Sequence, residues 1–372
     1  MNINDFKLER YFAKHEFSAK YLLSSSDCDG YELSYILENA SGDEIKLWNE
    51  LKLGYTESKG SPILREAILQ YYNIKNIENV VVATPGELNF ISMNILLNSN
   101  DHAITIAPSY QSLSEVVKSI KCDLSYWKPN TNTWEFNTND LKKLIQKNTK
   151  LIILNFPHNP TGSYLTRNQL HEIVNIAKRH DIYIFSDEMY HKLISENTEE
   201  LPPIADIYDK GISLWGTSKT FGLGGLRTGW LVTKDLDFID KAIAFKDYLS
   251  ICNSAPSEIL SIMALNNIDK FLAPNLLKIR NNIHIFDQFV KNQKIISSFI
   301  APKAGSTCFV KLNIKQSSLE FSNNLVEKTG IMTVPSEMYA FEGKYIRVGF
   351  GRSNFPEVLQ ELDMYFKNYE TH

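Results

Sequence analysis

Short apolar runs alternate with segments of helical periodicity between residue 60 and about residue 235. Runs that are apolar at consecutive positions are typical of strands buried on both faces, as in a parallel sheet covered by helices. We therefore predict an α/β domain with a mostly parallel sheet. The expected strands are 80–83, 102–106, 151–155, 182–186, 212–215 and 228–232, and the expected helices are 64–72, 90–97, 112–120 and 168–180.

The pattern changes after about residue 236. Helices predicted at 237–250, 257–265 and 275–292 precede strands at 307–312 and 345–350, and a last helix covers 356–369. Helices and strands mixed in this way indicate a smaller α+β domain. We predict a large domain over 41–265 and a small domain built from 1–40 and 266–372.

Composition and charge exclude several classes of function. The 372 residues carry a formal net charge of −4, which offers no broad basic field for a nucleic acid. No stretch reaches the roughly 20 apolar residues of a membrane span, and we expect no signal peptide. The four cysteines (Cys28, Cys122, Cys252, Cys308) form no CxxC pair, so we expect reduced thiols, no metal site and a cytoplasmic protein.

Lys219 occupies a small-residue turn directly after a predicted buried strand, within Trp215-Gly-Thr-Ser-Lys-Thr-Phe-Gly-Leu-Gly-Gly-Leu-Arg227. Burying an ammonium group is costly, whereas a covalent bond to an aldehyde cofactor removes the charge. The surrounding glycines allow a ligand to approach the backbone, and Arg227 offers a guanidinium that suits a phosphate. The alternative is a glycine-rich loop with a surface lysine.

Asn159 lies between two prolines in Asn155-Phe-Pro-His-Asn-Pro-Thr-Gly162, which follows another predicted buried strand. Ligands of open α/β sheets bind at the carboxyl ends of the strands, where this amide can meet a ring substituent. The alternative is an ordinary Pro-Thr-Gly turn.

Asp187 follows the predicted strand 182–186 in Ser186-Asp-Glu-Met-Tyr190. A carboxylate beside a pyridine nitrogen keeps that nitrogen protonated and makes the ring an electron sink. Tyr190 can hydrogen-bond the phenolic oxygen of such a cofactor. The alternative is that these acidic residues are solvated charges at the end of a strand.

These three segments together resemble the aspartate-aminotransferase superfamily of pyridoxal-phosphate fold type I, and in particular its class I/II aminotransferases. The resemblance covers nearly the whole chain. It implies that Lys219 forms the Schiff base with pyridoxal 5'-phosphate and that Asp187 pairs with the pyridine nitrogen. It also implies that Asn159 and Tyr190 contact the phenolic oxygen and that Arg227 binds the phosphate.

Weaker matches extend the resemblance. Gly86-Glu87-Leu88 is similar to the family's phosphate cup, in which backbone N–H groups at a helix N-terminus hold the anion. Tyr110 is similar to the aromatic residue that stacks on the cofactor ring, with simple core packing as the alternative.

Two further residues are similar to family positions outside the cofactor pocket proper. Tyr55 resembles the tyrosine that reaches the phosphate of a neighbouring subunit, which implies a homodimer with shared active sites. Arg347 stands inside an apolar strand, where it needs a carboxylate partner, and the family supplies the α-carboxylate of the substrate.

One position departs from the family pattern. Many relatives carry a hydroxyl three residues before the lysine to bind phosphate, whereas this chain has Gly216. Thr217 or Ser218 can take over that contact.

The sequence thus predicts a pyridoxal-phosphate-dependent aminotransferase that moves an amino group from an amino acid to a 2-oxo acid by a ping-pong mechanism. Elimination, cyclisation or oxidation on the same fold stays open, because fold does not choose the reaction. The segment 21–29 resembles the capreomycidine-synthase-like group, so Asp27 or Asp29 meets a cationic, arginine-like substrate or is simply solvated. A catalytically inactive relative would be expected to lack Lys219 or Asp187.

Overall fold

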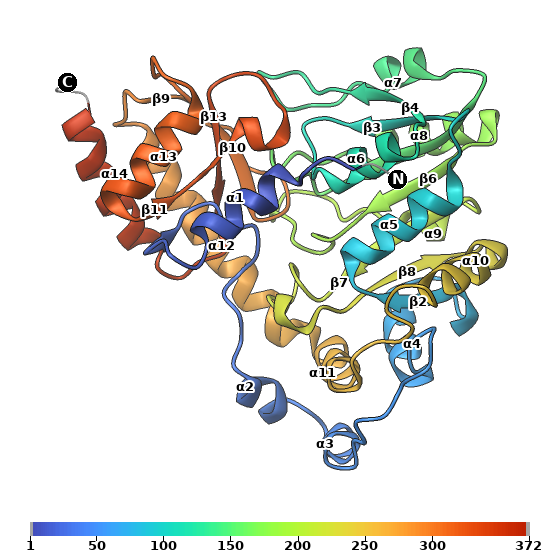
Figure 1. Cartoon of the computed structure of the whole chain (residues 1–372). Coiled ribbons are helices and arrows are strands. Elements are labelled where there is room, and N and C mark those ends of the chain that lie inside the picture. Colours follow the sequence, from blue (N-terminus) through green and yellow to red (C-terminus); the bar gives the residue numbers. More distant parts are fainter. Residues whose placement is uncertain (1–2, 370–372) are drawn as a thin grey trace.

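A seven-stranded sheet forms the centre of the larger part of the molecule in the computed structural model, which describes residues 3–369 (Figure 1). β8 runs in the opposite direction to the other six strands, which are parallel to one another, so the prediction of a mostly parallel sheet is confirmed. In spatial order the strands are β2 (Val80–Ala83), β8 (Gly229–Thr233), β7 (Gly211–Gly216), β6 (Tyr183–Asp187), β5 (Thr149–Asn155), β3 (His102–Ile106) and β4 (Asp123–Trp127).

Helices cover both faces of this sheet because its strands are apolar on both sides. Ala103 and Phe185 pack in one core, whereas their neighbours Ile104 and Ile184 pack in another on the opposite face. The helices are α4 (Pro62–Leu69), α5 (Pro85–Leu96), α6 (Ser112–Ser119), α7 (Thr138–Leu144), α8 (Arg167–His180), α9 (Ile204–Ile207), α10 (Leu236–Lys246) and α11 (Ala255–Asn266).

The smaller part holds a four-stranded antiparallel sheet with the order β12-β13-β10-β9. Its elements are α12 (Ile268–Val290), β9 (Ile296–Ser298), β10 (Thr307–Leu312), α13 (Ser318–Thr329), β11 (Ile331–Met332), β12 (Val334–Pro335), β13 (Tyr345–Gly349) and α14 (Phe355–Tyr369). The N-terminal β1 (Tyr21–Leu22) pairs with β11, so this N-terminal strand lies beside a strand of the C-terminal part. The domain boundaries at residues 40 and 265 stay a prediction.

Several elements were not predicted. The sequence pattern did not indicate α1 (Lys7–His15), α2 (Leu33–Glu38), α3 (Gly42–Asn49) or α13. The edge strand β4 was missed because its burial is partial, so it lacks the continuous apolar run of the central strands. Among residues 3–369, no helix has the length and apolar character of a membrane span, and no group of His, Cys, Asp or Glu is arranged to hold a metal ion.

The leader 21–29 lies against β13 and its continuation through backbone contacts. Gly349 N donates to Leu23 O at 2.8 Å, and Asp29 N donates to Gly351 O at 3.1 Å. A Cβ atom on Gly349 would lie 1.7 Å from Ser25 O, so a side chain at this position would push the leader away.

Gly349→Ala should therefore lower the free energy of unfolding by about 3 kcal/mol, since it inserts a carbon atom where backbone already lies. Gly42→Ala is the control, because a Cβ at Gly42 meets no atom within 4 Å. Urea denaturation followed by circular dichroism measures both variants. Equal midpoints for Gly349→Ala and the wild type would show that the leader does not pack here.

Candidate active site

The predicted site residues converge at one edge of the large sheet, where the parallel strands end. Asn155 closes β5 and is in register with Asp187, which closes β6. Lys219 follows the end of β7, and Tyr110 follows β3. Because β7, β6, β5 and β3 are consecutive in the sheet, these four positions lie along one edge.

Lys219 extends into a largely buried space. Its Nζ donates a hydrogen bond to Ser26 Oγ in the leader at 2.9 Å. Burial lowers the pKa of Lys219, the charge of Asp27 opposes that shift, and the charge of Arg347 adds to it. A lower pKa increases the fraction of neutral amine, which is the form that attacks an aldehyde.

Asp187 is buried, and no cation in the described part of the chain forms a salt bridge with it. Met189 N donates to its Oδ1 at 3.2 Å, and burial raises the pKa of Asp187 to about 6. A protonated ring nitrogen would supply the missing positive charge. Nearby, Tyr190 Oη is buried and has no partner in good hydrogen-bond geometry among the described residues, so a ligand oxygen fits there.

Arg347 is a buried cation with only 1% of its surface exposed. Its Nε donates to Ser24 O at 2.9 Å and its Nη1 donates to Asn159 Oδ1 at 3.2 Å, while Tyr339 Oη lies beside the same nitrogen. No carboxylate in the described part of the chain forms a salt bridge with Arg347, and its Nη2 is left without a partner there. A ligand carboxylate would satisfy both the charge and the free donor.

The N-terminus of α5 is open at Gly86. Gly86 is exposed, and a Cβ built on it meets no atom within 4 Å. Thr84 Oγ1 accepts from Glu87 N at 3.4 Å and Thr84 O accepts from Leu88 N at 3.0 Å, so Gly86 N–H is the group of this first turn that remains available to a ligand among the described residues. Leu88 is buried in the core, and Arg227 is exposed with its Nη1 donating to Gly224 O at 3.1 Å.

Gly216 has no room for the side chain that many relatives carry. A Cβ there would lie 2.8 Å from Thr228 O. The Thr217 hydroxyl lies within 3.3 Å of Leu223 O and 3.2 Å of Thr228 O, so its proton is engaged by the backbone. Ser218 Oγ has no such bond among the described residues, which favours Ser218 over Thr217 as the phosphate donor.

Ser218→Ala should accordingly weaken the binding of pyridoxal phosphate about tenfold, as expected when a hydrogen bond to a charged group is lost. Quenching of tryptophan fluorescence by added cofactor gives the dissociation constant. Thr217→Val is the matched variant, and its dissociation constant should stay within about twofold of the wild type. The reverse order of the two effects would assign the contact to Thr217.

Helix α1, which the sequence analysis did not anticipate, covers the site. Tyr110 Oη donates to Glu9 Oε1 at 2.7 Å, and the Tyr110 ring lies 4.8 Å from the Phe6 ring. Phe12 lies 5.6 Å from the Arg347 guanidinium. The only sequence signal for this cover is the helical spacing of residues 8, 11 and 15, which are buried beneath α1.

Asp27 and Tyr55, which were predicted to belong to the site, do not join the other site residues within this chain. Both carboxylate oxygens of Asp27 accept from Arg352 Nη2, at 3.0 and 3.1 Å, so Asp27 is already paired. Tyr55 is 91% exposed in the loop between α3 and α4 and meets none of the other site residues within this chain.

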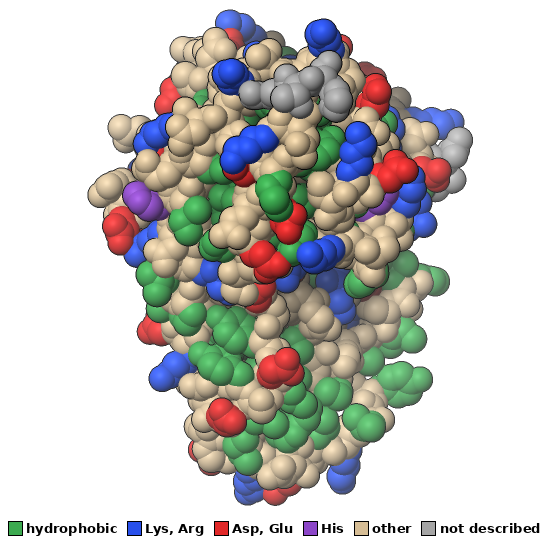
Figure 2. Space-filling view, turned by 90° about the vertical axis from the view of Figure 1, so that its left-hand side faces the viewer, with side chains coloured by type: hydrophobic (Ala, Val, Ile, Leu, Met, Phe, Trp, Pro, Cys, Tyr) green, Lys and Arg blue, Asp and Glu red, His purple; other side chains and the backbone are tan. Residues whose placement is uncertain are grey.

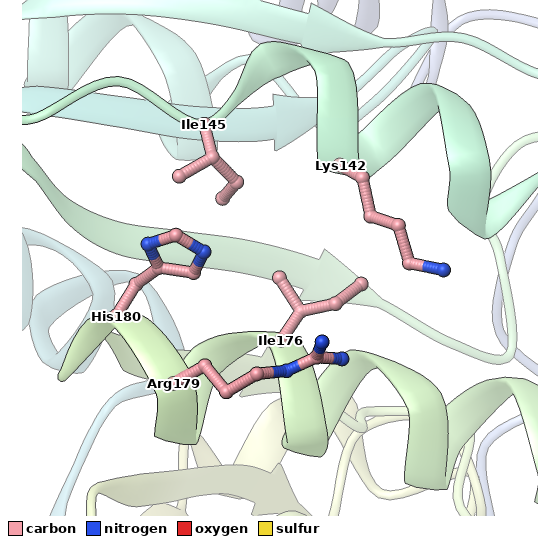
Figure 3. A pocket seen from close by; sticks show the side chains of 5 residues that line it. All are labelled: Lys142, Ile145, Ile176, Arg179 and His180. Atoms are coloured by element: carbon pink, nitrogen blue, oxygen red, sulfur yellow. The ribbon is translucent and has the colours of Figure 1, made fainter.

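A hollow between α7 and α8 lies away from the site (Figure 3). His180 ends α8 shortly before β6 begins, so this hollow faces the amino ends of the strands, opposite to the edge with Asp187. It is lined by Lys142, Ile145, Ile176, Arg179 and His180.

Comparison with known proteins identifies the family. The family model described as aminotransferase class I and II matches residues 19–361. The chain belongs to that family. Aspartate aminotransferase of Sulfolobus acidocaldarius is 27% identical over 317 residues, which is 80% of this chain and 78% of that protein. Capreomycidine synthase of Streptomyces vinaceus is 24% identical over 371 residues, or 98% and 94% of the two chains.

Solved structures give the same result for this aminotransferase fold. A pyridoxal-phosphate-dependent aminotransferase from Streptococcus suis superposes with a TM-score of 0.91 at 28% identity over 99% of both chains. The pyridoxal-phosphate-dependent cyclase OrfR superposes with the same TM-score at 21% identity, which shows the fold alone. This family member is thus an enzyme of the aminotransferase type with pyridoxal 5'-phosphate as its cofactor. The free donors and the uncompensated carboxylate described above fit that cofactor.

Proposed function

We propose that this enzyme moves an amino group from an amino acid to a 2-oxo acid, and that the first product leaves before the second substrate binds. The observation that carries this proposal is the meeting of a desolvated Lys219, a buried Asp187 and an Arg347 that lacks a carboxylate partner. When bound, the cofactor supplies an aldehyde that bonds to an amine and a ring that withdraws electrons from the substrate's α-carbon.

Two side chains of the protein then act on the substrate, one by binding its carboxylate and one by moving a proton. Arg347 binds the α-carboxylate of the substrate, and its bond to Ser24 O fixes the orientation of the guanidinium. Lys219 Nζ takes the proton from the α-carbon, because burial lowers the pKa of this amine and so favours the neutral form that acts as a base.

The remaining groups hold the cofactor in place. Asp187 keeps a proton on the ring nitrogen, and the Tyr190 hydroxyl and the Asn159 amide bind the phenolic oxygen. The first turn of α5 at Gly86, Glu87 and Leu88, where Gly86 N–H is the free donor among the described residues, would bind the phosphate together with Ser218 and Arg227. Tyr110 would stack on one face of the ring.

Product analysis tests the proposal. The purified enzyme with pyridoxal phosphate is incubated with single amino acids and either 2-oxoglutarate or pyruvate, and new amino acids are detected by mass spectrometry. We expect transfer of the amino group and parallel double-reciprocal plots. Release of ammonia or peroxide without any transfer would contradict it.

Cyclisation or elimination is the second candidate. It is favoured by the likeness to capreomycidine synthase, which extends over 98% of this chain and therefore includes the leader 21–29. The same incubation without a 2-oxo acid distinguishes the two, because cyclisation or elimination consumes the amino acid alone whereas transfer stops after one turnover per site.

We propose a homodimer because aromatic and apolar side chains are exposed on the surface beside the α3–α4 loop. Tyr55 and Tyr248 are both 91% exposed, and the segments that carry them are joined by the bond from Thr56 Oγ1 to Asn253 O at 3.2 Å. Exposed apolar residues near them are Leu53, Leu249 and Ile251. Figure 2 shows further hydrophobic side chains gathered over the lower part of the molecule, where α2 and α3 lie in Figure 1. Exposed apolar surface of this kind favours a protein interface.

Analytical ultracentrifugation tests the dimer, with Tyr55→Ala/Tyr248→Ala expected to shift it to monomer. Sharing of sites is tested by mixing Tyr55→Phe and Lys219→Ala subunits, since a hybrid would contain one site with neither change. A wild-type monomer would refute the proposal of a homodimer.

The cytoplasmic location of the protein stays a prediction.

A further inference from the structure

One face of α1 carries two acidic residues and an aromatic residue toward the site. Glu9, Phe12 and Glu16 are spaced by three and four residues, which places them on the same side of a helix. The opposite side is buried against the small domain, where Leu8 and Tyr11 belong to one core with Met332, Val334 and Tyr339. The packing of α1 therefore fixes the orientation of the helix, with Glu9, Phe12 and Glu16 toward the site.

The acidic face lies along the space between Tyr110 and Lys219. Glu9 accepts the hydrogen bond from Tyr110 Oη, and Phe12 lies over the Arg347 guanidinium. Glu16 comes at the C-terminal end of α1, where burial and the charges of Asp27 and Glu9 raise its pKa. The three side chains thus follow one another from the predicted cofactor ring to the leader.

Among the described residues, Glu9 and Glu16 form no salt bridge, unlike the acidic residues of the leader. Asp27 is paired with Arg352, and Asp29 is paired with Lys278 at 2.6 Å. Glu9 has only the neutral tyrosine as a hydrogen-bond donor, and no side chain in the described part of the chain donates to the Glu16 carboxylate. The cations that act on Glu16 are Lys219 and Arg352. Arg352 is already paired with Asp27, and the positive charge of Lys219 is lost when its amine forms a covalent bond to an aldehyde.

A ligand that complements Glu9 and Glu16 must carry a positive group. It must bring this group to α1 while its carboxylate is bound by Arg347. Two half-buried carboxylates without a counter-ion are unfavourable unless a positive group lies between them or beside them. Arg347 and its unpaired Nη2 give the position of the α-carboxylate, and the Phe12 ring beside it offers an apolar surface to the methylene groups of a side chain.

We propose that Glu9 and Glu16 select an amino-acid substrate whose side chain ends in a guanidinium or ammonium group. This proposal rests on the proposed function, because it assumes that the amino acid binds between Arg347 and the cofactor. It differs from the prediction for Asp27, because the recognition belongs to α1 and not to the leader carboxylates, which are already paired.

Equilibrium binding tests the proposal with matched ligands. The enzyme loaded with pyridoxal phosphate is titrated with the α-methyl derivatives of arginine and of citrulline, which has nearly the same shape but no charge. These ligands lack the α-proton and bind without transfer of the amino group, so the change in cofactor absorbance gives the two dissociation constants. The α-methyl derivatives of lysine and norleucine form a second pair. We expect the cationic member of at least one pair to bind about tenfold to a hundredfold more tightly, as charged hydrogen bonds allow.

Variants assign the preference to α1. Glu9→Gln and Glu16→Gln should each reduce the ratio of the two dissociation constants, and the double variant should bring it close to one by weakening only the cationic ligand. Asp5→Asn is the matched control, because Asp5 is an exposed carboxylate just before α1 and its loss should leave the ratio unchanged. All variants should retain the absorbance of the bound cofactor.

Three results would overturn the proposal. Equal affinity of the wild type for the charged and neutral members of both pairs would show that no cation is recognised. A ratio that survives the double variant would place the recognition elsewhere. A fall of the ratio in Asp5→Asn equal to that in the α1 variants would indicate only a general field effect. Failure of the wild type to bind pyridoxal phosphate would instead refute the proposed function itself.

Discussion

Lys219→Ala is expected to bind pyridoxal phosphate without a covalent bond and to lose turnover by a factor on the order of 10⁴. The variant removes both the amine that bonds to the aldehyde and the general base, whereas the phosphate and ring contacts stay in place. The absence of the absorbance band of the covalently bound cofactor and the rate of amino-group transfer measure the two effects separately.

Lys210→Ala is the matched control for that variant. Lys210 immediately precedes β7 and pairs with Asp181 at 2.6 Å, so it lies at the opposite end of the strand that leads to Lys219. Its loss should change neither the absorbance nor the rate by more than about twofold, as is usual for a surface ion pair. Wild-type turnover in Lys219→Ala would remove this lysine from the mechanism.

Asp187→Asn is expected to reduce turnover by about 10²- to 10³-fold, the usual loss when a charge that stabilises a transition state is removed. The amide keeps the shape of the side chain but cannot hold a proton on the ring nitrogen. The pKa of Asp187 is raised to about 6 by burial, so above that pH the empty site holds an uncompensated negative charge. Cofactor binding should therefore raise the melting temperature more at pH 8 than at pH 5 in the wild type, and this difference should vanish in Asp187→Asn.

Glu188→Gln is the control on the neighbouring residue. Burial raises the pKa of Glu188 to about 8, so its carboxyl group is mostly neutral at pH 7, and its Oε1 accepts from Ile204 N and Ser213 Oγ. An amide oxygen can accept both bonds, so turnover should stay within about threefold. A loss in Glu188→Gln as large as that in Asp187→Asn would show that the effect is structural and not electrostatic.

The central strands were predictable because they are buried on both faces. Residues 80–83 and 102–106 coincide with β2 and β3, where continuous apolar runs leave no alternative to a covered strand. Helix α1 was not predictable in this way. It is short and largely polar, and the burial of Leu8 and Tyr11 depends on a sheet formed more than 300 residues later in the chain.

The same distinction applies to the site. Asp187 ends a strand, and Asn159 and Lys219 follow strands. The topology of a parallel sheet brings such strand ends together whatever the loops do. Other contacts of the site join segments that are remote in sequence, as Ser26 does with Lys219 and Glu9 with Tyr110. The contact of Tyr339 with Arg347 is closer in sequence. Such long-range contacts have no periodic signal in the sequence.

The central claim is that Lys219 carries the cofactor, and reduction with borohydride tests it most directly. The enzyme is incubated with pyridoxal phosphate, reduced, digested and analysed by mass spectrometry of the peptides. We expect a phosphopyridoxyl group on the peptide that contains Lys219 and on no other peptide at comparable yield. A modification centred on another lysine, or none, would contradict it.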